Sequence, residues 1–169
     1  MNDSTTYTRC ESPLGDLLLV AHDDTLCGVY FAGQKYFPAV APAWRESDTV
    51  PVLRAVCAQL REYFAGSRST FALPMAPRGT AFQRAVWNAI AAVSHGATAT
   101  YADIAAAAGH AGSARAAGAA TGRNPWTIVV PCHRIVASNG ALTGYAGGLA
   151  RKRALLALEA TGRRDLLAA

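Results

Sequence analysis

The apolar positions in the first half of the chain predict a small sheet followed by a helix. Apolar runs at 17–21 and 26–31 flank the polar turn 22–25, a pattern typical of a β-hairpin. Apolar residues then recur at helical spacing over 52–64, and Gly66 is placed to end that helix. The segment 71–75 suits a further short strand. We therefore predict an α/β N-terminal domain over residues 1–77, made of a small sheet with a helix.

The second half, residues 78–169, predicts a mainly α-helical domain. Thr80 is placed to cap a helix whose apolar face runs to position 93, and Thr100 begins a capping box for a short helix that ends at Gly109. Ser113 can cap a further helix that ends near Gly122. Two short helices joined by a glycine-containing turn are the outline of a helix-turn-helix. A last helix is predicted from about 150 to 160.

The apolar segment 126–130 is interpreted as a short buried strand that holds Cys132 in a fixed direction. Neighbouring side chains of a strand point to opposite faces, so we expect the strand to end at Pro131 and a helical turn to begin there. The thiolate is the reactive form of cysteine. His133 and nearby positive charge are expected to lower the pKa of Cys132 from about 8.5.

Glu159 falls on the face of the last predicted helix that Leu155 and Leu156 would bury. A carboxylate that points inward needs a partner. His133 is one candidate, because a carboxylate that fixes an imidazole beside a thiol is a common way to activate a nucleophile. The alternative is an ion pair with Arg163, four residues further along the helix surface.

Charge divides the chain near residue 77. Residues 1–77 carry six Lys/Arg and eight Asp/Glu, whereas residues 78–169 carry ten and three, so the whole net charge of +5 comes from the second half. A basic surplus of this kind suits a polyanion such as nucleic acid. The chain is 51% hydrophobic and 16% charged, which is typical of a soluble globular protein. We expect no membrane span, no secretory signal and a cytoplasmic location.

The four cysteines, at 10, 27, 57 and 132, form no CxxC pair and accompany no export signal, so free thiols are predicted rather than disulfides. Cys10, His22 and Cys27 raise the question of a zinc site. They lack a clear fourth ligand, and their spacing is not that of a zinc finger. We expect no metal and no cofactor.

The Pro-Cys-His-Arg sequence at 131–134 stands among several short motifs: Asn-Pro at 124–125, Gly-Tyr-Ala-Gly-Gly-Leu at 144–149, and the segment 152–159. Together they resemble the signature of the O6-alkylguanine-DNA alkyltransferases. The resemblance covers roughly residues 60–160, and residues 1–59 match more loosely, mainly through Ser-Pro-Leu-Gly at 12–15. It implies a ribonuclease H-like N-terminal domain and irreversible repair of O6-alkylguanine by a suicide methyltransferase.

The resemblance also implies roles for individual residues. Cys132 would accept the alkyl group, His133 and Glu159 would activate it through a water, and Asn124 would brace the turn before it. Arg115 would fill the space left by a flipped base. The remaining DNA contacts would come from Gln83, Tyr101, Ala102 and Ser138. The base pocket would be formed by Tyr101, Trp126, Ile135, Tyr145, Ala146 and Gly147.

The implied partner is double-stranded DNA containing O6-alkylguanine, bound by a monomer after base flipping. The sequence leaves open the range of alkyl groups, activity on O4-alkylthymine and cooperativity on DNA. Two other classes compete with this interpretation. One is a binding module, either an alkyltransferase-like protein or a helix-turn-helix regulator. The other is a cysteine hydrolase that uses Cys132, His133 and Asn124.

Overall fold

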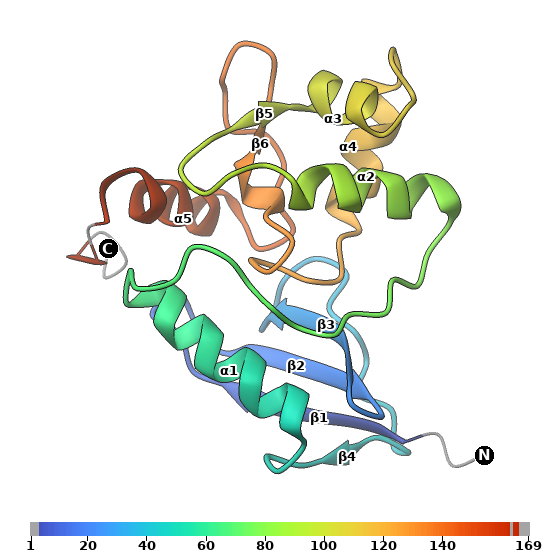
Figure 1. Ribbon diagram of the computed structural model, residues 1–169, viewed down its shortest axis with the longest axis vertical. Helices are drawn as coiled ribbons and strands as arrows, with labels where there is room; N and C mark the ends of the chain where they lie inside the picture. Colours follow the sequence, from blue (N-terminus) through green and yellow to red (C-terminus); the bar gives the residue numbers. More distant parts are fainter. Residues whose placement is uncertain (1–3, 163, 166–169) are drawn as a thin grey trace.

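The computed structural model describes residues 4–162 and 164–165 (Figure 1). A four-stranded sheet forms the first half, in the order β3-β2-β1-β4, with β1 to β3 antiparallel and β4 parallel to β1. The predicted hairpin is confirmed as β2–β3, whereas β1 and β4 were not predicted. The strands are β1 (Thr5–Cys10), β2 (Leu17–His22), β3 (Thr25–Phe31) and β4 (Arg45–Glu46).

Helix α1 (Pro51–Phe64) lies against one face of this sheet, as its apolar spacing predicted (Figure 1). Pro51 occupies the first turn, where its missing N–H costs no hydrogen bond. The backbone N–H of Val52, which has no partner within the helix, donates to the Asp24 carboxylate at 2.8 Å and ties the start of the helix to the β2–β3 turn. Tyr63, at the end of the buried stripe, is 1% exposed.

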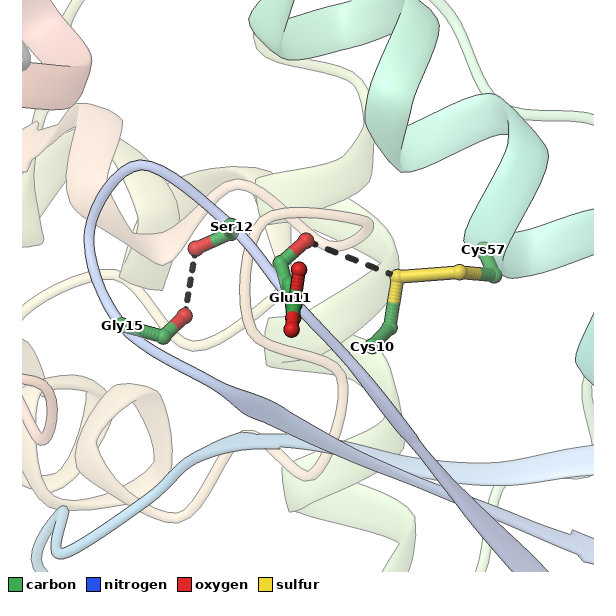
Figure 2. The surroundings of a disulfide bond; sticks show 5 residues. All are labelled: Cys10, Glu11, Ser12, Gly15 and Cys57. Atoms are coloured by element: carbon green, nitrogen blue, oxygen red, sulfur yellow. Dashed lines mark hydrogen bonds between the residues drawn. A yellow bond between two sulfur atoms is a disulfide. The ribbon is translucent and has the colours of Figure 1, made fainter.

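The prediction of four free thiols is wrong, because Cys10 and Cys57 form a disulfide. It joins the end of β1 to the middle of α1, with the two Cα atoms 6.0 Å apart (Figure 2). Cys27 and Cys132 are free. The prediction relied on motif spacing and location, which do not show that two cysteines 47 residues apart meet where a helix packs on a sheet. The bond also removes Cys10 as a metal ligand.

The second half is mainly helical, as predicted. Thr80 and Thr100 both complete capping boxes, with Gln83 and Asp103 respectively, and Ser113 takes the N-cap position of α4 without a side-chain hydrogen bond. Helices α3 and α4 pack together around the turn 108–113 and give the helix-turn-helix outline. The elements are α2 (Ala81–Ala91), β5 (Ala99–Thr100), α3 (Tyr101–Ala107), α4 (Ala114–Gly122), β6 (Ile135–Val136) and α5 (Leu149–Thr161).

The segment 126–130 is buried but is not a strand, which corrects the prediction. It pairs with the edge of β3 only through Val29, whose N–H donates to Pro125 and whose carbonyl accepts from Thr127. Ile128 then adopts a φ of 72°, a left-handed conformation that a β-branched residue rarely takes. The segment therefore turns sharply, and it covers the open edge of β3 as it does so.

The predicted strand at 71–75 is likewise reduced to a single bridge between Met75 and Leu26. Pro74 accepts a hydrogen bond from the Leu26 N–H at 2.8 Å but has no N–H of its own to extend a ladder. Among the described residues, no helix is long and apolar enough to cross a membrane. The same residues hold no group of three His, Cys, Asp or Glu side chains that could bind a metal ion.

We predict that the Cys10–Cys57 disulfide stabilises the fold. Cys57→Ser is expected to lower the free energy of unfolding by about 2–4 kcal/mol, because the bond closes a long loop in the unfolded chain. Urea unfolding with and without dithiothreitol measures this. The reductant should shift the midpoint of a Cys27→Ser control but not that of Cys57→Ser. Four reactive thiols in the unreduced, denatured protein would contradict the bond.

Candidate active site

Cys132 opens a short 3-10 turn, η1 (Cys132–Arg134), immediately after Pro131, as predicted. Its thiol is buried, and its Sγ accepts a hydrogen bond from Asn124 Nδ2 at 3.2 Å. The same amide donates to the Val130 carbonyl at 2.8 Å and accepts from the Trp126 N–H at 3.0 Å. Asn124 therefore fixes the irregular turn 126–130 and directs one N–H at the sulfur.

The pKa of Cys132 is raised from its ordinary value, so the expectation of a lowered pKa is wrong. Burial dominates, because removing the thiolate from water disfavours the charged form. The hydrogen bond from Asn124, the charge of Lys152 and backbone N–H groups act in the opposite direction without overcoming burial. The thiol is consequently protonated at neutral pH.

Glu159 lies on the inner face of α5, and its carboxylate is buried beneath several donors. His133 Nε2 lies 2.7 Å from Oε1, and Arg134 donates to both oxygens at 2.8 and 2.9 Å. Tyr63 of α1 donates to Oε1 at 2.7 Å. These donors hold the pKa of Glu159 well below its usual range although burial alone would raise it. Arg163, the alternative partner, lies outside the described residues.

The carboxylate determines the state of the His133 ring. An ionised Glu159 can only accept, so His133 Nε2 carries the hydrogen and donates it. Burial lowers the pKa of His133, which keeps the imidazole neutral. Its Nδ1 is then an acceptor, and it is buried without a hydrogen-bond partner among the described residues. His133 is therefore a neutral imidazole with an open acceptor nitrogen, which is the state that a Glu–His–Cys arrangement would require of its histidine.

Sequence reasoning missed three residues of this cluster: Tyr63, Arg134 and Lys152. Lys152 is fully buried and donates to the carbonyls of Ile135, Thr143 and Gly144, which holds the 143–144 backbone in place. Burial lowers its pKa. Arg134 and Lys152 both lie in the recognised motifs, at 131–134 and 152–159. A search for charged residues on the buried face of the last predicted helix would therefore have identified Lys152. Nothing in the sequence pointed to Tyr63.

A cavity of about 320 Å³ leads to Cys132. Its walls are Tyr101, α4 residues 118, 119, 121 and 122, and the 144–146 loop, and residues 35 and 36 of the first half also line it. Tyr101 donates to the Thr143 carbonyl at 2.9 Å, which links the start of α3 to that loop. The Tyr145 hydroxyl has no hydrogen-bond partner in the described part of the chain.

Three predicted pocket residues do not line this cavity. Trp126 lies in the core, where its ring packs edge-on against Trp87 and its Nε1–H donates to the Leu26 carbonyl. Ile135 is fully buried in β6. Gly147 is packed so closely that an added Cβ would lie 2.8 Å from Tyr145 and 3.1 Å from Phe31. All three residues are buried.

The predicted DNA-contact residues lie mostly on the surface. Arg115, near the start of α4, and Ala102, near the start of α3, are exposed, and Ser138 is exposed in the loop after β6. Gln83 is half-buried, and its side chain is engaged in the capping box with Thr80. Arg115 and Ala102 thus stand on the two helices of the helix-turn-helix outline.

Both halves of the chain match domains of a single family. Residues 5–77 match the ribonuclease-like domain of 6-O-methylguanine DNA methyltransferase, and residues 81–161 match its DNA binding domain. Together these two matches span nearly all the described residues. The chain belongs to the 6-O-methylguanine DNA methyltransferase family.

Known relatives agree with this membership. The methylated-DNA--protein-cysteine methyltransferase of Methanosarcina acetivorans is 43% identical over 153 residues, or 90% of this chain and 97% of that protein. The constitutive enzyme of that name from Bacillus subtilis is 40% identical, covering 89% and 92%. Mycobacterium tuberculosis OGT, crystallised in complex with DNA, superposes with a TM-score of 0.90 at 39% identity, covering 96% of this chain and 98% of that one.

We predict that Tyr63→Phe lowers the free energy of unfolding by about 1.5–3 kcal/mol, because it removes a buried hydrogen bond to a charged group. Tyr7→Phe is the matched control, since the Tyr7 hydroxyl donates to Glu46 at 3.5 Å on the exposed surface. Its effect should stay within about 0.5 kcal/mol. Equal effects in urea unfolding would show that the Tyr63–Glu159 contact does not stabilise the protein.

We also predict the pH dependence of the thiol. In a Cys27→Ser background, the rate of Cys132 alkylation by iodoacetamide should rise with pH through a midpoint above about 8.5, the ordinary cysteine value. Asn124→Ala should move the midpoint further up, because it removes a donor that favours the thiolate. A midpoint below about 8.5 would contradict the raised pKa of Cys132. A downward shift in an Asn124→Ala variant that remains folded by circular dichroism would contradict the role of the Asn124 hydrogen bond.

Proposed function

We propose that this protein repairs DNA by transferring the alkyl group of O6-alkylguanine to the sulfur of Cys132. The observation that carries the proposal is the position of that thiol. It lines a cavity, its sulfur accepts a hydrogen bond from the Asn124 amide, and the next residue along the chain, His133, is paired with Glu159. Membership of the family and the DNA complex of M. tuberculosis OGT support both the reaction and the DNA partner.

The thiol loses its proton only as the reaction begins. His133 Nδ1 takes the proton of Cys132 through one water, and the positive ring that results is stabilised by the Glu159 carboxylate. The sulfur then attacks the alkyl carbon, an S–C bond forms, and the bond from that carbon to O6 breaks. The electron pair leaves with guanine, whose ring is protonated or hydrogen-bonded as it departs. The Tyr145 hydroxyl, which has no hydrogen-bond partner among the described residues, is available as a donor.

Guanine must leave the base stack to reach this cavity. Extruding a nucleotide costs a few kcal/mol, least for a weakened pair. We assign Arg115 to the space left in the duplex, because it is exposed near the start of α4, the helix whose later residues line the cavity. Ala102 and Ser138 lie on the surface, where the DNA backbone can reach them. To contact DNA, the Gln83 side chain would have to release its capping contact with Thr80. A monomer suffices for all these contacts.

The product is a thioether, which is not readily hydrolysed, so each molecule acts once. The geometry favours this reaction over a cysteine hydrolase. In a Cys-His-Asn hydrolase the amide orients the histidine, whereas here Asn124 donates to the sulfur and Glu159 holds the imidazole.

We predict stoichiometric transfer. Protein incubated with duplex DNA carrying O6-[³H-methyl]guanine should gain about one label per molecule, located on Cys132 by peptide mapping. Cys132→Ala should gain none and Cys27→Ser should equal the wild type. Continued turnover beyond one equivalent, or transfer to another residue, would refute the proposal. Lesion binding by Cys132→Ala together with no transfer by the wild type would instead favour a binding module.

A further inference from the structure

A segment of the N-terminal half reaches the mouth of the cavity that ends at Cys132. Lys35 and Tyr36 follow β3 in the chain, yet both line this cavity together with α4 and the 144–146 loop. Lys35 is the one charged side chain among the described residues that line it. The first half, which is acidic overall, thus places a cation at the entrance of a pocket built mainly by the basic second half.

The segment is held in a fixed position by contacts with the second half. Gln34 is buried, and its Oε1 accepts from the Phe31 N–H at 2.8 Å and from the Thr127 hydroxyl at 3.2 Å. The Lys35 N–H donates to the Ala146 carbonyl at 2.9 Å. Tyr36 has a φ of 61°, which a side chain of this size rarely adopts. The surrounding contacts therefore maintain a strained backbone, a feature that often marks functional positions.

Tyr36 brings two cations together at this point. The Arg123 guanidinium lies over its ring, 3.8 Å from the centroid, and the Lys35 ammonium lies 5.0 Å from the same centroid. The ring is 45% exposed, and neither cation forms an ion pair with a carboxylate in residues 4–162 or 164–165. Two like charges held beside one aromatic ring, without a counter-ion from the described residues, favour the binding of an anion close to them.

We infer that Lys35, Tyr36 and Arg123 form a phosphate clamp that holds the backbone of the extruded nucleotide at the pocket entrance. A nucleotide that enters the cavity brings its two flanking phosphates to the mouth, where these cations lie. Tyr36 is a positioning residue, because its ring orients both charges. The clamp rests on the proposed function, since it presupposes that a nucleotide of DNA enters this cavity.

The test is the salt dependence of DNA binding. All proteins carry Cys132→Ala, so that no transfer occurs, and fluorescence anisotropy gives the affinity for a duplex with one O6-methylguanine over a series of KCl concentrations. Lys35→Gln and Arg123→Gln should each lower the magnitude of the slope of log K against log[KCl] by about one, and the double variant by about two. For an undamaged duplex, which presents no extruded nucleotide, the changes should be smaller.

Three control variants sharpen this result. Arg54→Gln removes the same charge from the exposed side of α1 and should keep the slope of the Cys132→Ala parent. Tyr36→Phe keeps the ring and should keep the affinity of the Cys132→Ala parent, whereas Tyr36→Leu should weaken lesion binding about as much as the loss of one cation. If Lys35→Gln and Arg123→Gln behave like Arg54→Gln, the clamp is refuted.

A substrate without phosphate distinguishes two roles for these residues, binding of the DNA phosphates and contact with the base inside the pocket. With Cys132 intact, transfer from the free base O6-benzylguanine should fall less in Lys35→Gln and Arg123→Gln than transfer from lesion DNA. Equal losses on both substrates would overturn the clamp and assign these residues to the base itself. A wild type that transfers from neither substrate would refute the proposed function, whatever the salt slopes show.

Discussion

The buried carboxylate of Glu159 is the constraint on which the rest of the site depends. An ionised carboxylate removed from water is costly unless donors surround it, and here they come from separate parts of the chain. Tyr63 belongs to α1, His133 and Arg134 belong to η1, and the Gly96 N–H, at 3.4 Å, follows α2. One charge thus fixes the relative positions of α1, α5 and the turn that carries Cys132.

The same charge explains how a thiol with a raised pKa can serve as a nucleophile. A permanent thiolate at Cys132 would be exposed to oxidants and adventitious electrophiles, and a protein that acts once cannot recover from such losses. Burial keeps the sulfur protonated, while the Glu159–His133 pair holds the next residue along the chain as a neutral base whose Nδ1 has no hydrogen-bond partner among the described residues. In the proposed mechanism, activation is therefore delayed until a substrate enters the cavity and presents its alkyl carbon.

Local signals in the sequence predicted most of the helices and the hairpin. The features that were not predicted depend on contacts between residues far apart in the chain. The capping boxes at Thr80 and Thr100 and the hairpin turn depend on neighbouring residues, so they could be predicted. The turn at 126–130 could not, because an apolar run does not show that the Asn124 side chain replaces a strand partner. The Cys10–Cys57 bond and the Tyr63–Glu159 contact join positions 47 and 96 residues apart. No short-range pattern encodes such separations.

The N-terminal half acquires a role in the site through these distant contacts. Its acidic balance gives no reason to expect DNA contact, and β3 ends far in sequence from Cys132. However, the open edge of β3 needs a partner, and the 125–127 segment covers it. That pairing places the residues after β3 against the 144–146 loop, where Gln34 and the Lys35 N–H bind the second half. Covering a strand edge thus positions both the turn before Cys132 and the cations at the pocket entrance.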